Sequence, residues 1–286
     1  MRYALVAQWQ QKAGISQACR LLQVSRSAYY ASKQRAQTSL ICAHTVHLQA
    51  AFTASGRSYG SRRLVAALKA KHIQIGRYKV RRLMRQAKIE PVWSRKPVLS
   101  TSRQHDLPMA NNVLNRQFNP QAPNQAWVSD MTYVRTRTGW LYLAVVLELF
   151  SRKVIGWAMD LSMTADLVCR ALQMAIGQRG PSTGLIVHSD RGSQYTSGEY
   201  QYLLKRHGMT CSMSRPGNCY DNAVMERFFL SVKKERVWQG EYANPLQARQ
   251  DITDYIVGFY NSVRLHSALG NLTPMMYEKK WQKKPI

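Results

Sequence analysis

The sequence predicts an α/β protein in which a mixed five-stranded sheet with flanking helices follows a small all-helical region. Two observations support this class. From residue 127 onward, short runs rich in β-branched and aromatic residues alternate with segments of helical periodicity, as in layered α/β folds. The charge is also uneven: residues 1–120 hold 21 Lys and Arg against 2 acids, whereas residues 121–286 hold 20 against 13. The chain therefore divides into a basic helical part and a sheet-forming part that contains nearly all the carboxylates.

Residues 1–90 are predicted to be a helical, helix-turn-helix-like DNA-binding region. In "ISQACRLLQVSRSAYYASKQ", Ser16 and Ser25 stand at expected helix N-caps on either side of a tight break. A second helical pair is expected in "YGSRRLVAALKAKHIQIGRYKVRRLMRQAKI". Its later helix has apolar residues at the 3.6-residue spacing of a buried stripe, namely Val80, Leu83, Met84 and Ala87.

A second face of that later helix is cationic. Its members recur at spacings of four, four and three residues: Arg77, Arg81, Arg85 and Lys88. A charged stripe is ordinarily a solvated helix face. Because positions 77–88 are rich in Lys and Arg and contain no acid, we instead expect this ridge to contact DNA phosphates. Residues 91–120, with four prolines and no sustained periodicity, are predicted to be a basic linker.

The sheet-forming part is predicted to run from 121 to 240, followed by a helical tail over 241–286. Three strands are expected first, then helix, strand, helix, strand and a long helix. Strands are expected in "WVSDMTYVRT", "WLYLAVVLELF", "KVIGWAM", "GLIVHSD" and "MTCSMS". Thr164 is the expected N-cap of the first helix, Thr196 with Glu199 forms a capping box for the second, and Asp221 or Asn222 caps the third.

The composition limits the classes of molecule that the chain is expected to bind. The formal net charge of +26 favours a polyanion such as nucleic acid. No stretch reaches the roughly 18 apolar residues of a spanning helix, and the N-terminal apolar core is too short for a secretion signal. We therefore expect no membrane partner and a cytoplasmic location. Five cysteines without a CxxC predict reduced thiols, and Cys42 with His44 and His47 lacks a second ligand pair for zinc.

Three carboxylates stand out in a chain so short of acids. Asp130 lies in the first strand, Asp190 closes the fourth, and Glu226 lies in the first turns of the long helix, with 59 and 35 residues between them. Each has an ordinary alternative as a turn former, an Asx-turn or a surface ion pair. Together they predict a site for divalent cations, because Mg²⁺ and Mn²⁺ prefer oxygen ligands and two such ions support in-line phosphoryl transfer.

The motifs that flank these three acids resemble those of a known family. "WVSDMTYVRTRTGWLYLAVVLELFSRKVIGWAM", "VHSDRGSQYTS" and "SMSRPGNCYDNAVMERFFLSVKKE" closely resemble the catalytic core of OrfB-type bacterial insertion-sequence transposases, relatives of the retroviral integrases. The resemblance implies an RNase H-like fold and an Asp-Asp-Glu triad of Asp130, Asp190 and Glu226 that binds two Mg²⁺ or Mn²⁺ ions. Glu148 departs from the family pattern, which has Asp there, and the zinc module of the retroviral integrases is absent.

The resemblance implies a DNA transposase that cleaves and joins strands at the terminal repeats of a mobile element and inserts them into target DNA. It implies a bacterial, nucleoid-associated protein, a homo-oligomer on DNA, and a frame often fused to an upstream helix-turn-helix frame. Lys233, Arg215 and Asn218 are predicted to contact DNA around the triad. The alternatives are a non-catalytic DNA-binding regulator of transposition and an RNase H-like nuclease. The polar cluster of Asn261, Arg264 and His266 matches the family without a chemical role.

Overall fold

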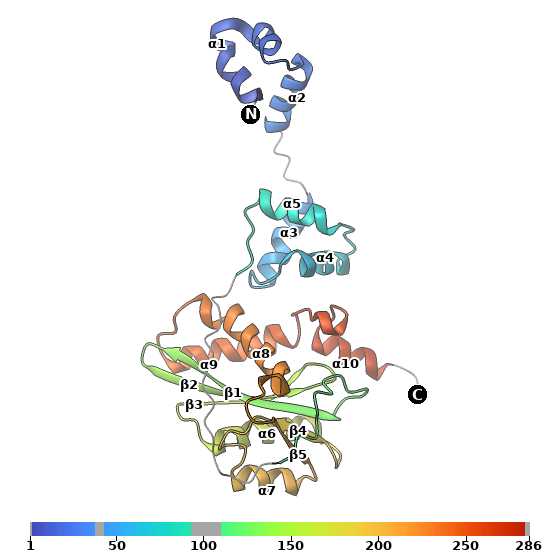
Figure 1. Ribbon diagram of the computed structural model, residues 1–286, viewed down its shortest axis with the longest axis vertical. Coiled ribbons are helices and arrows are strands. Elements are labelled where there is room, and N and C mark those ends of the chain that lie inside the picture. Colours follow the sequence, from blue (N-terminus) through green and yellow to red (C-terminus); the bar gives the residue numbers. More distant parts are fainter. Residues whose placement is uncertain (1, 38–42, 93–109, 284–286) are drawn as a thin grey trace.

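The computed structural model describes residues 2–37, 43–92 and 110–283, and the sheet lies in the last of these segments (Figure 1). Its strands are β1 (Ala126–Thr136), β2 (Gly139–Glu148), β3 (Val154–Asp160), β4 (Ile186–Ser189) and β5 (Thr210–Met213). They are arranged in the order β3-β2-β1-β4-β5. The first three form an antiparallel meander, while β4 runs parallel to β1 and β5 parallel to β4. The predicted mixed five-stranded sheet is confirmed.

Helices cover both faces of this sheet (Figure 1). α6 (Ala165–Arg179) and α7 (Gly198–Arg206) pack on one face, and α8 (Ala223–Glu235) and α9 (Pro245–Asp254) pack on the other. Because successive strand side chains point to opposite faces, the neighbours Trp127 and Val128 are both fully buried but belong to different cores. The result is a layered α/β/α domain.

The close packing of α6 on β3 depends on one glycine. A Cβ atom at Gly156 would lie 2.2 Å from the carbonyl oxygen of Ala171 and 2.8 Å from the backbone nitrogen of Ala175. No side chain fits in that space, so the helix and strand backbones approach each other directly.

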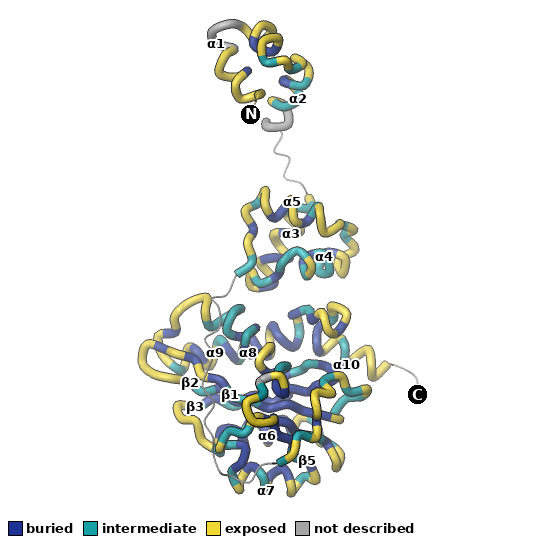
Figure 2. Tube along the Cα trace, viewed as in Figure 1, coloured by how far each residue is buried: buried dark blue, intermediate teal, exposed yellow. Residues whose placement is uncertain are grey.

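The described residues before the sheet contain α1 (Arg2–Leu21), α2 (Arg26–Gln37), α3 (Ala43–Ala54), α4 (Ser61–Ala70) and α5 (Arg77–Gln86). The helical region predicted before the sheet is therefore confirmed. α1 and α2 share a small core of their own. α3, α4 and α5 instead join the hydrophobic core that includes α8 and α9, which Figure 2 shows as buried stretches in both parts.

Helix starts were predicted with mixed success. Ser25 caps α2, since its Oγ accepts a hydrogen bond from the Ala28 N–H at 3.0 Å. Ser16 lies inside α1, whose break is at Gly14 with a φ of 72°. The capping box at Thr196 is wrong, because the N-cap residue of α7 is Ser197, whose Oγ accepts from the Tyr200 N–H at 3.3 Å. Thr196 donates instead to the Ser193 carbonyl at 3.2 Å.

The other two predicted N-cap residues stand directly before their helices but make no capping hydrogen bond. Thr164 is the N-cap residue of α6 and Asn222 that of α8, but neither side chain makes a capping hydrogen bond. Asp221 belongs to the single 3-10 turn Cys219–Asn222 that precedes α8.

The C-terminal tail packs against the sheet domain. After α9 comes a π-helical segment, Tyr255–Tyr260, and then α10 (Pro274–Gln282). Asn261 accepts from the Val154 N–H at 3.0 Å and donates to the Val154 carbonyl at 2.9 Å, which joins the tail to the start of β3. In α10, Glu278 is buried and pairs with Lys153 at 3.2 Å and with Arg179.

The predicted linker falls mostly outside the described residues, which resume at 110. From there the chain packs on the sheet domain: Leu114 is 2 % exposed, and the N–H groups of Val113 and Leu114 donate to Ser212 Oγ at 2.9 and 3.0 Å. Cys19, Cys169 and Cys211 are free thiols, while Cys42 lies outside the described residues. None of the helices in the described segments has the length and apolarity that a membrane crossing requires.

Candidate active site

Two aspartates meet at the edge where β1 and β4 diverge. The two strands are parallel, with Val128 opposite His188. Asp130 and Asp190 each follow their partner by two residues. The two residues therefore lie side by side, Asp130 within β1 and Asp190 directly after the end of β4, on strands whose spacing is about 4.8 Å. This register brings together carboxylates that are 60 positions apart in the sequence.

The two carboxylates are reachable by water but crowded by protein. Asp130 is partly buried, and its Oδ1 accepts from the Met131 N–H at 2.7 Å. The Asp190 Oδ1 accepts from the Gly192 N–H at 3.0 Å. Burial raises the pKa of Asp130 well above its usual range, and the neighbouring charge of Asp190 raises it further. Burial also raises the pKa of Asp190. Two adjacent carboxylates of this kind repel each other, and a bound cation removes that repulsion.

Glu226 faces this pair from the first turn of α8. Its side chain is exposed, burial raises its pKa, and its charge makes a smaller contribution to the raised pKa of Asp130. Within the described segments, no three His, Cys, Asp or Glu side chains stand close enough to hold one metal ion. The structure therefore brings the two aspartates together and places Glu226 close enough for its charge to act on Asp130.

A buried tyrosine forms the floor of the site. Tyr195 is fully buried, and its hydroxyl lies 3.2 Å from Ser129 Oγ. Burial raises the pKa of Tyr195 well above its usual range, and the charges of Asp130 and Asp190 add to this. Tyr195 therefore stays neutral beneath both carboxylates. The sequence analysis missed it, although it lies in the same "DRGSQYT" loop as Asp190.

The structure also places Lys233 at the site. Lys233 is on α8 and lies with its Nζ 5.2 Å from the centre of the Tyr133 ring. Burial lowers the pKa of Lys233, whereas the charge of Asp130 raises it. The amine is thus within electrostatic range of a site carboxylate. Its contact with DNA stays a prediction.

Arg215 and Asn218 have partners within the protein. Asp221 is fully buried and accepts from the Arg215 N–H at 3.0 Å, from its Nε at 2.9 Å and from its Nη2 at 2.9 Å. Arg116 Nε donates to the same carboxylate at 2.8 Å, and Arg116 Nη2 donates to Asn218 Oδ1 at 2.9 Å. This cluster holds the turn before α8. The DNA contacts of Arg215 and Asn218 stay a prediction.

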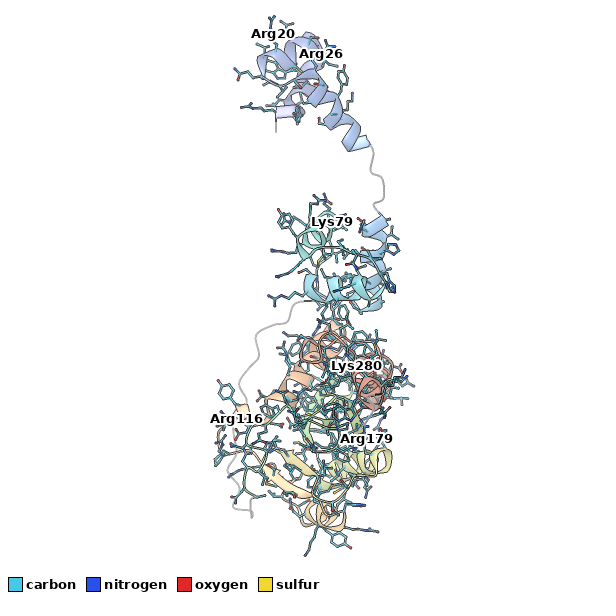
Figure 3. The ribbon with its side chains drawn as sticks, turned by 90° about the vertical axis from the view of Figure 1, so that its right-hand side faces the viewer. Arg20, Arg26, Lys79, Arg116, Arg179 and Lys280 are labelled. Carbon is cyan, nitrogen blue, oxygen red and sulfur yellow. The ribbon has the colours of Figure 1, made fainter. Side chains whose placement is uncertain are left out.

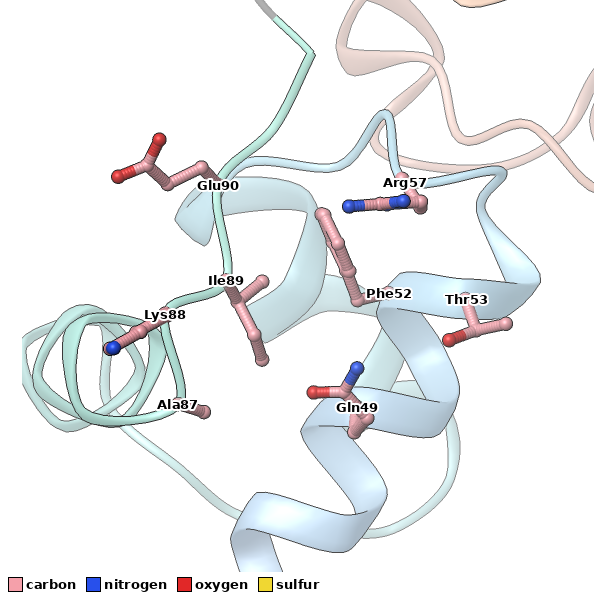
Figure 4. Close-up of a pocket in the computed structure, with 8 residues that line it drawn as sticks. All are labelled: Gln49, Phe52, Thr53, Arg57, Ala87, Lys88, Ile89 and Glu90. Atoms are coloured by element: carbon pink, nitrogen blue, oxygen red, sulfur yellow. The ribbon is translucent and has the colours of Figure 1, made fainter.

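Three members of the cationic ridge are exposed on α5, namely Arg77, Arg81 and Arg85, and Val80, Leu83 and Met84 are buried on the same helix. The predicted helix was too long, because α5 ends at Gln86. Half-buried Ala87 and exposed Lys88 lie beyond it, and Lys88 has a left-handed φ of 51°. Lys88 and Arg57 line a hollow of about 430 Å³ between α3 and the chain after α5 (Figure 4). Basic side chains such as Arg20, Arg26 and Lys79 project from the N-terminal helices (Figure 3).

Family comparisons agree with this arrangement. Residues 120–219 and 207–274 match integrase core domains, and residues 44–97 match an HTH-like domain. The transposase InsF for insertion sequence IS3A of Escherichia coli (strain K12) is 41% identical over 285 residues, covering 98% of this chain and 99% of the relative. The 31 kDa protein of insertion element IS600 of Shigella sonnei is 39% identical over 270 residues, covering 92% and 98%.

Retroviral integrases are among the solved structures that resemble the chain. The simian T-cell lymphotropic virus intasome in complex with PP2A regulatory subunit B56 gamma matches with a TM-score of 0.48 at 18% identity, covering 77% of this chain and 72% of that one. The HTLV-2 integrase catalytic core domain in complex with magnesium (trimeric form) matches with a TM-score of 0.43 at 18% identity, covering 55% and 97%.

Proposed function

Since the chain belongs to the insertion-sequence transposase family that includes InsF, we propose that Asp130, Asp190 and Glu226 are its catalytic centre and act on the ends of a mobile DNA element. The chain is a polynucleotidyl transferase with an integrase core domain. The observation that carries the site assignment is the parallel register of β1 and β4, which sets Asp130 beside Asp190.

The side chains fit a divalent cation. The charge of Asp190 raises the pKa of Asp130, and no Lys or Arg within the described segments forms an ion pair with either carboxylate. Asp130 and Asp190 would hold Mg²⁺, or Mn²⁺ in its place, and Glu226 would complete a site for two ions. When bound, such ions activate the attacking oxygen and stabilise the leaving oxygen of a phosphodiester.

The chain's own residues orient the DNA. The charge of Lys233 acts on Asp130, and this amine would contact a phosphate next to the reacting one. In the first step, water attacks a phosphodiester at the element end, and the leaving strand carries a 3′-hydroxyl. In the second, that hydroxyl attacks a target phosphodiester. Each step forms one P–O bond and breaks one, so joining needs no added energy source.

The proposal includes DNA as partner at both the terminal repeats and the target. The cationic ridge of α5 would bind phosphates outside the reacting ones. Because two ends are joined to one target, we propose a homo-oligomer on DNA. Fusion to an upstream helix-turn-helix frame and association with the bacterial nucleoid stay predictions.

The test is an end-joining assay with labelled element ends and Mg²⁺. Asp130→Asn, Asp190→Asn and Glu226→Gln should each reduce joining by at least about 100-fold, since each removes a charge that the reaction requires, while DNA binding is retained. The control is Asp166→Asn on α6, a 66 % exposed side chain in an i,i+4 pair with Arg170. Joining at the parental rate by any of the three would remove that residue from the mechanism.

The same assay separates the alternatives. A nuclease would release hydrolysed ends without joined products. A regulator would bind the ends and give neither product.

A further inference from the structure

An aromatic pair lies exposed on the β1–β2 hairpin. Tyr133 on β1 is 54 % exposed, and Trp140 on β2 is 44 % exposed. Their ring centroids are 5.2 Å apart at an interplanar angle of 85°, an edge-to-face contact. Large apolar rings at these exposures are left partly in water, and neither belongs to the hydrophobic cores.

A positively charged side chain lies over each ring. Lys233 Nζ lies 5.2 Å from the centre of the Tyr133 ring, and Arg135 Cζ lies 5.8 Å from the centre of the Trp140 ring. Arg135 and Trp140 are opposite each other in the β1–β2 ladder, so they occupy the same face of the hairpin. Neither cation forms an ion pair with an acid in the described part of the chain.

The pair lies on the same hairpin as Asp130. Tyr133 follows Asp130 by three residues, about 10 Å along the strand at 3.3 Å per residue, so the two side chains lie on opposite faces of β1. Lys233 links the two, since it contacts the Tyr133 ring and its charge interacts with Asp130. A stacked nucleic-acid strand rises about 3.4 Å per nucleotide, so this spacing along β1 corresponds to about three nucleotides.

This combination suits single-stranded nucleic acid better than an apolar protein surface. Rings beside unpaired positive charges offer a π-face to a base and a cation to its phosphate, and such platforms tolerate any base sequence. A protein partner would have to cover Lys233 and Arg135 with acids, whereas the strands at a catalytic site bring phosphates to the same place.

Resting on the proposed function, we propose that Tyr133 and Trp140 form a stacking platform that holds unpaired bases at the DNA end, with Lys233 and Arg135 on the adjoining phosphates. The platform keeps the last few base pairs open and so delivers a single strand to the carboxylates. It acts on the ends before joining.

The test uses the full chain and element-end duplexes that carry 2-aminopurine at each of the last four positions, in EDTA so that no chemistry occurs. Binding should quench the fluorescence at the platform positions, because the base stacks on a ring. Tyr133→Leu with Trp140→Leu should abolish the quenching and weaken binding to frayed ends by about 5- to 150-fold for each lost ring. Tyr133→Phe with Trp140→Phe should restore both, since the rings remain.

A matched control is Tyr202→Leu on α7, a 67 % exposed tyrosine far along the chain from the hairpin, which should leave quenching unchanged. Full quenching by the double Leu variant would refute the stacking platform but leave the proposed active site unaffected. Asp130→Asn should keep the quenching and lose joining; if it joins strands, the proposed function fails instead. If the Leu variants do not fold, element ends that carry 5-iodouracil are photocrosslinked to the unaltered protein. Crosslinks to Tyr133 or Trp140 support the platform. Crosslinks that map only to other residues refute it.

Discussion

Replacing Asp221 by Asn tests how the turn before α8 is held. The side chain of Asp221 is fully buried and accepts five hydrogen bonds: three from Arg215, one from Arg116 and one from Asn112 Nδ2 at 2.9 Å. Asn keeps the shape but removes the charge, and its amide nitrogen faces donors where an acceptor stood. Hydrogen bonds to a charged group contribute about 1.5 to 3 kcal/mol each.

The net loss is smaller than that sum. The Arg116 and Arg215 side chains are 43 % and 48 % exposed, so water can replace part of what they lose. We expect Asp221→Asn to lower the free energy of unfolding at pH 7 by about 2 to 4 kcal/mol. Urea denaturation followed by circular dichroism measures this, with Asp166→Asn as a control that should change stability by less than about 0.5 kcal/mol.

The pH dependence gives an independent check. Hydrogen bonds from Arg215 hold the pKa of Asp221 well below its usual range in the folded protein. A lowered pKa stabilises the fold above the unfolded pKa, about 3.9, and that stabilisation is lost as the pH falls below it. The gap between parent and variant should thus be constant from pH 5 to 7 and narrow below about pH 4. A gap under 1 kcal/mol at pH 7, or one that widens in acid, would refute this reasoning.

Three further predictions concern other parts of the chain. Changing Arg77, Arg81 and Arg85 together to Gln should weaken binding to all DNA sequences and flatten the plot of log affinity against log salt by roughly 0.9 per lost phosphate contact, as measured by fluorescence anisotropy. Gly156→Ala should lower the free energy of unfolding by about 3 kcal/mol or more, because a Cβ there would lie 2.2 Å from a carbonyl oxygen of α6. Tyr59→Phe should cost about 1 to 2 kcal/mol in thermal denaturation, since its hydroxyl accepts from the N–H of residue 265 at 2.7 Å and donates to the carbonyl of residue 263 at 3.3 Å.

Each of these has an outcome that contradicts it. An unchanged salt slope would make the ridge of α5 a solvated helix face. Gly177→Ala on α6, where nothing lies within 4 Å of an added Cβ, should be neutral or stabilising, and a loss equal to that of Gly156→Ala would point to the helix rather than the close approach. Parental stability of the Tyr59 variant would mean that water replaces the hydroxyl.

Local pattern was enough to predict the sheet. The strands and helices from 126 onward each carry their own periodicity and turn residues, so they could be found one at a time. The adjacency of Asp130 and Asp190 depends instead on the parallel pairing of β1 with β4, across an intervening meander and helix. No local pattern encodes that register, and the sequence analysis reached those residues through motifs.

Polar contacts between residues far apart in the chain could not be predicted from the sequence. Asp221 appeared to be a helix cap because its neighbours allowed one, yet its partners Arg116 and Asn112 lie 105 and 109 residues earlier. Arg215 appeared free to contact DNA, although its partner Asp221 lies only six residues later. Glu148 departs from its family pattern, but its carboxylate accepts from the Phe150 and Ser151 N–H groups at 2.9 and 2.6 Å, a local role that either acid could fill.

α8 connects the proposed catalytic carboxylates to the HTH-like unit. Glu226 stands in its first turn, and Glu235 ends it nine residues later, about 13.5 Å along the axis. Glu235 accepts from Arg264 Nη2 and Nε at 2.8 Å and pairs with Arg63 of α4 at 3.7 Å. Because Arg264 is 5 % exposed, this anchor is held in place by buried, charge-assisted hydrogen bonds that water cannot readily replace. α8, a helix of 13 residues, thus has a proposed catalytic acid at one end and an ion pair with the HTH-like unit at the other, so the position of that unit depends on the same helix as the position of Glu226.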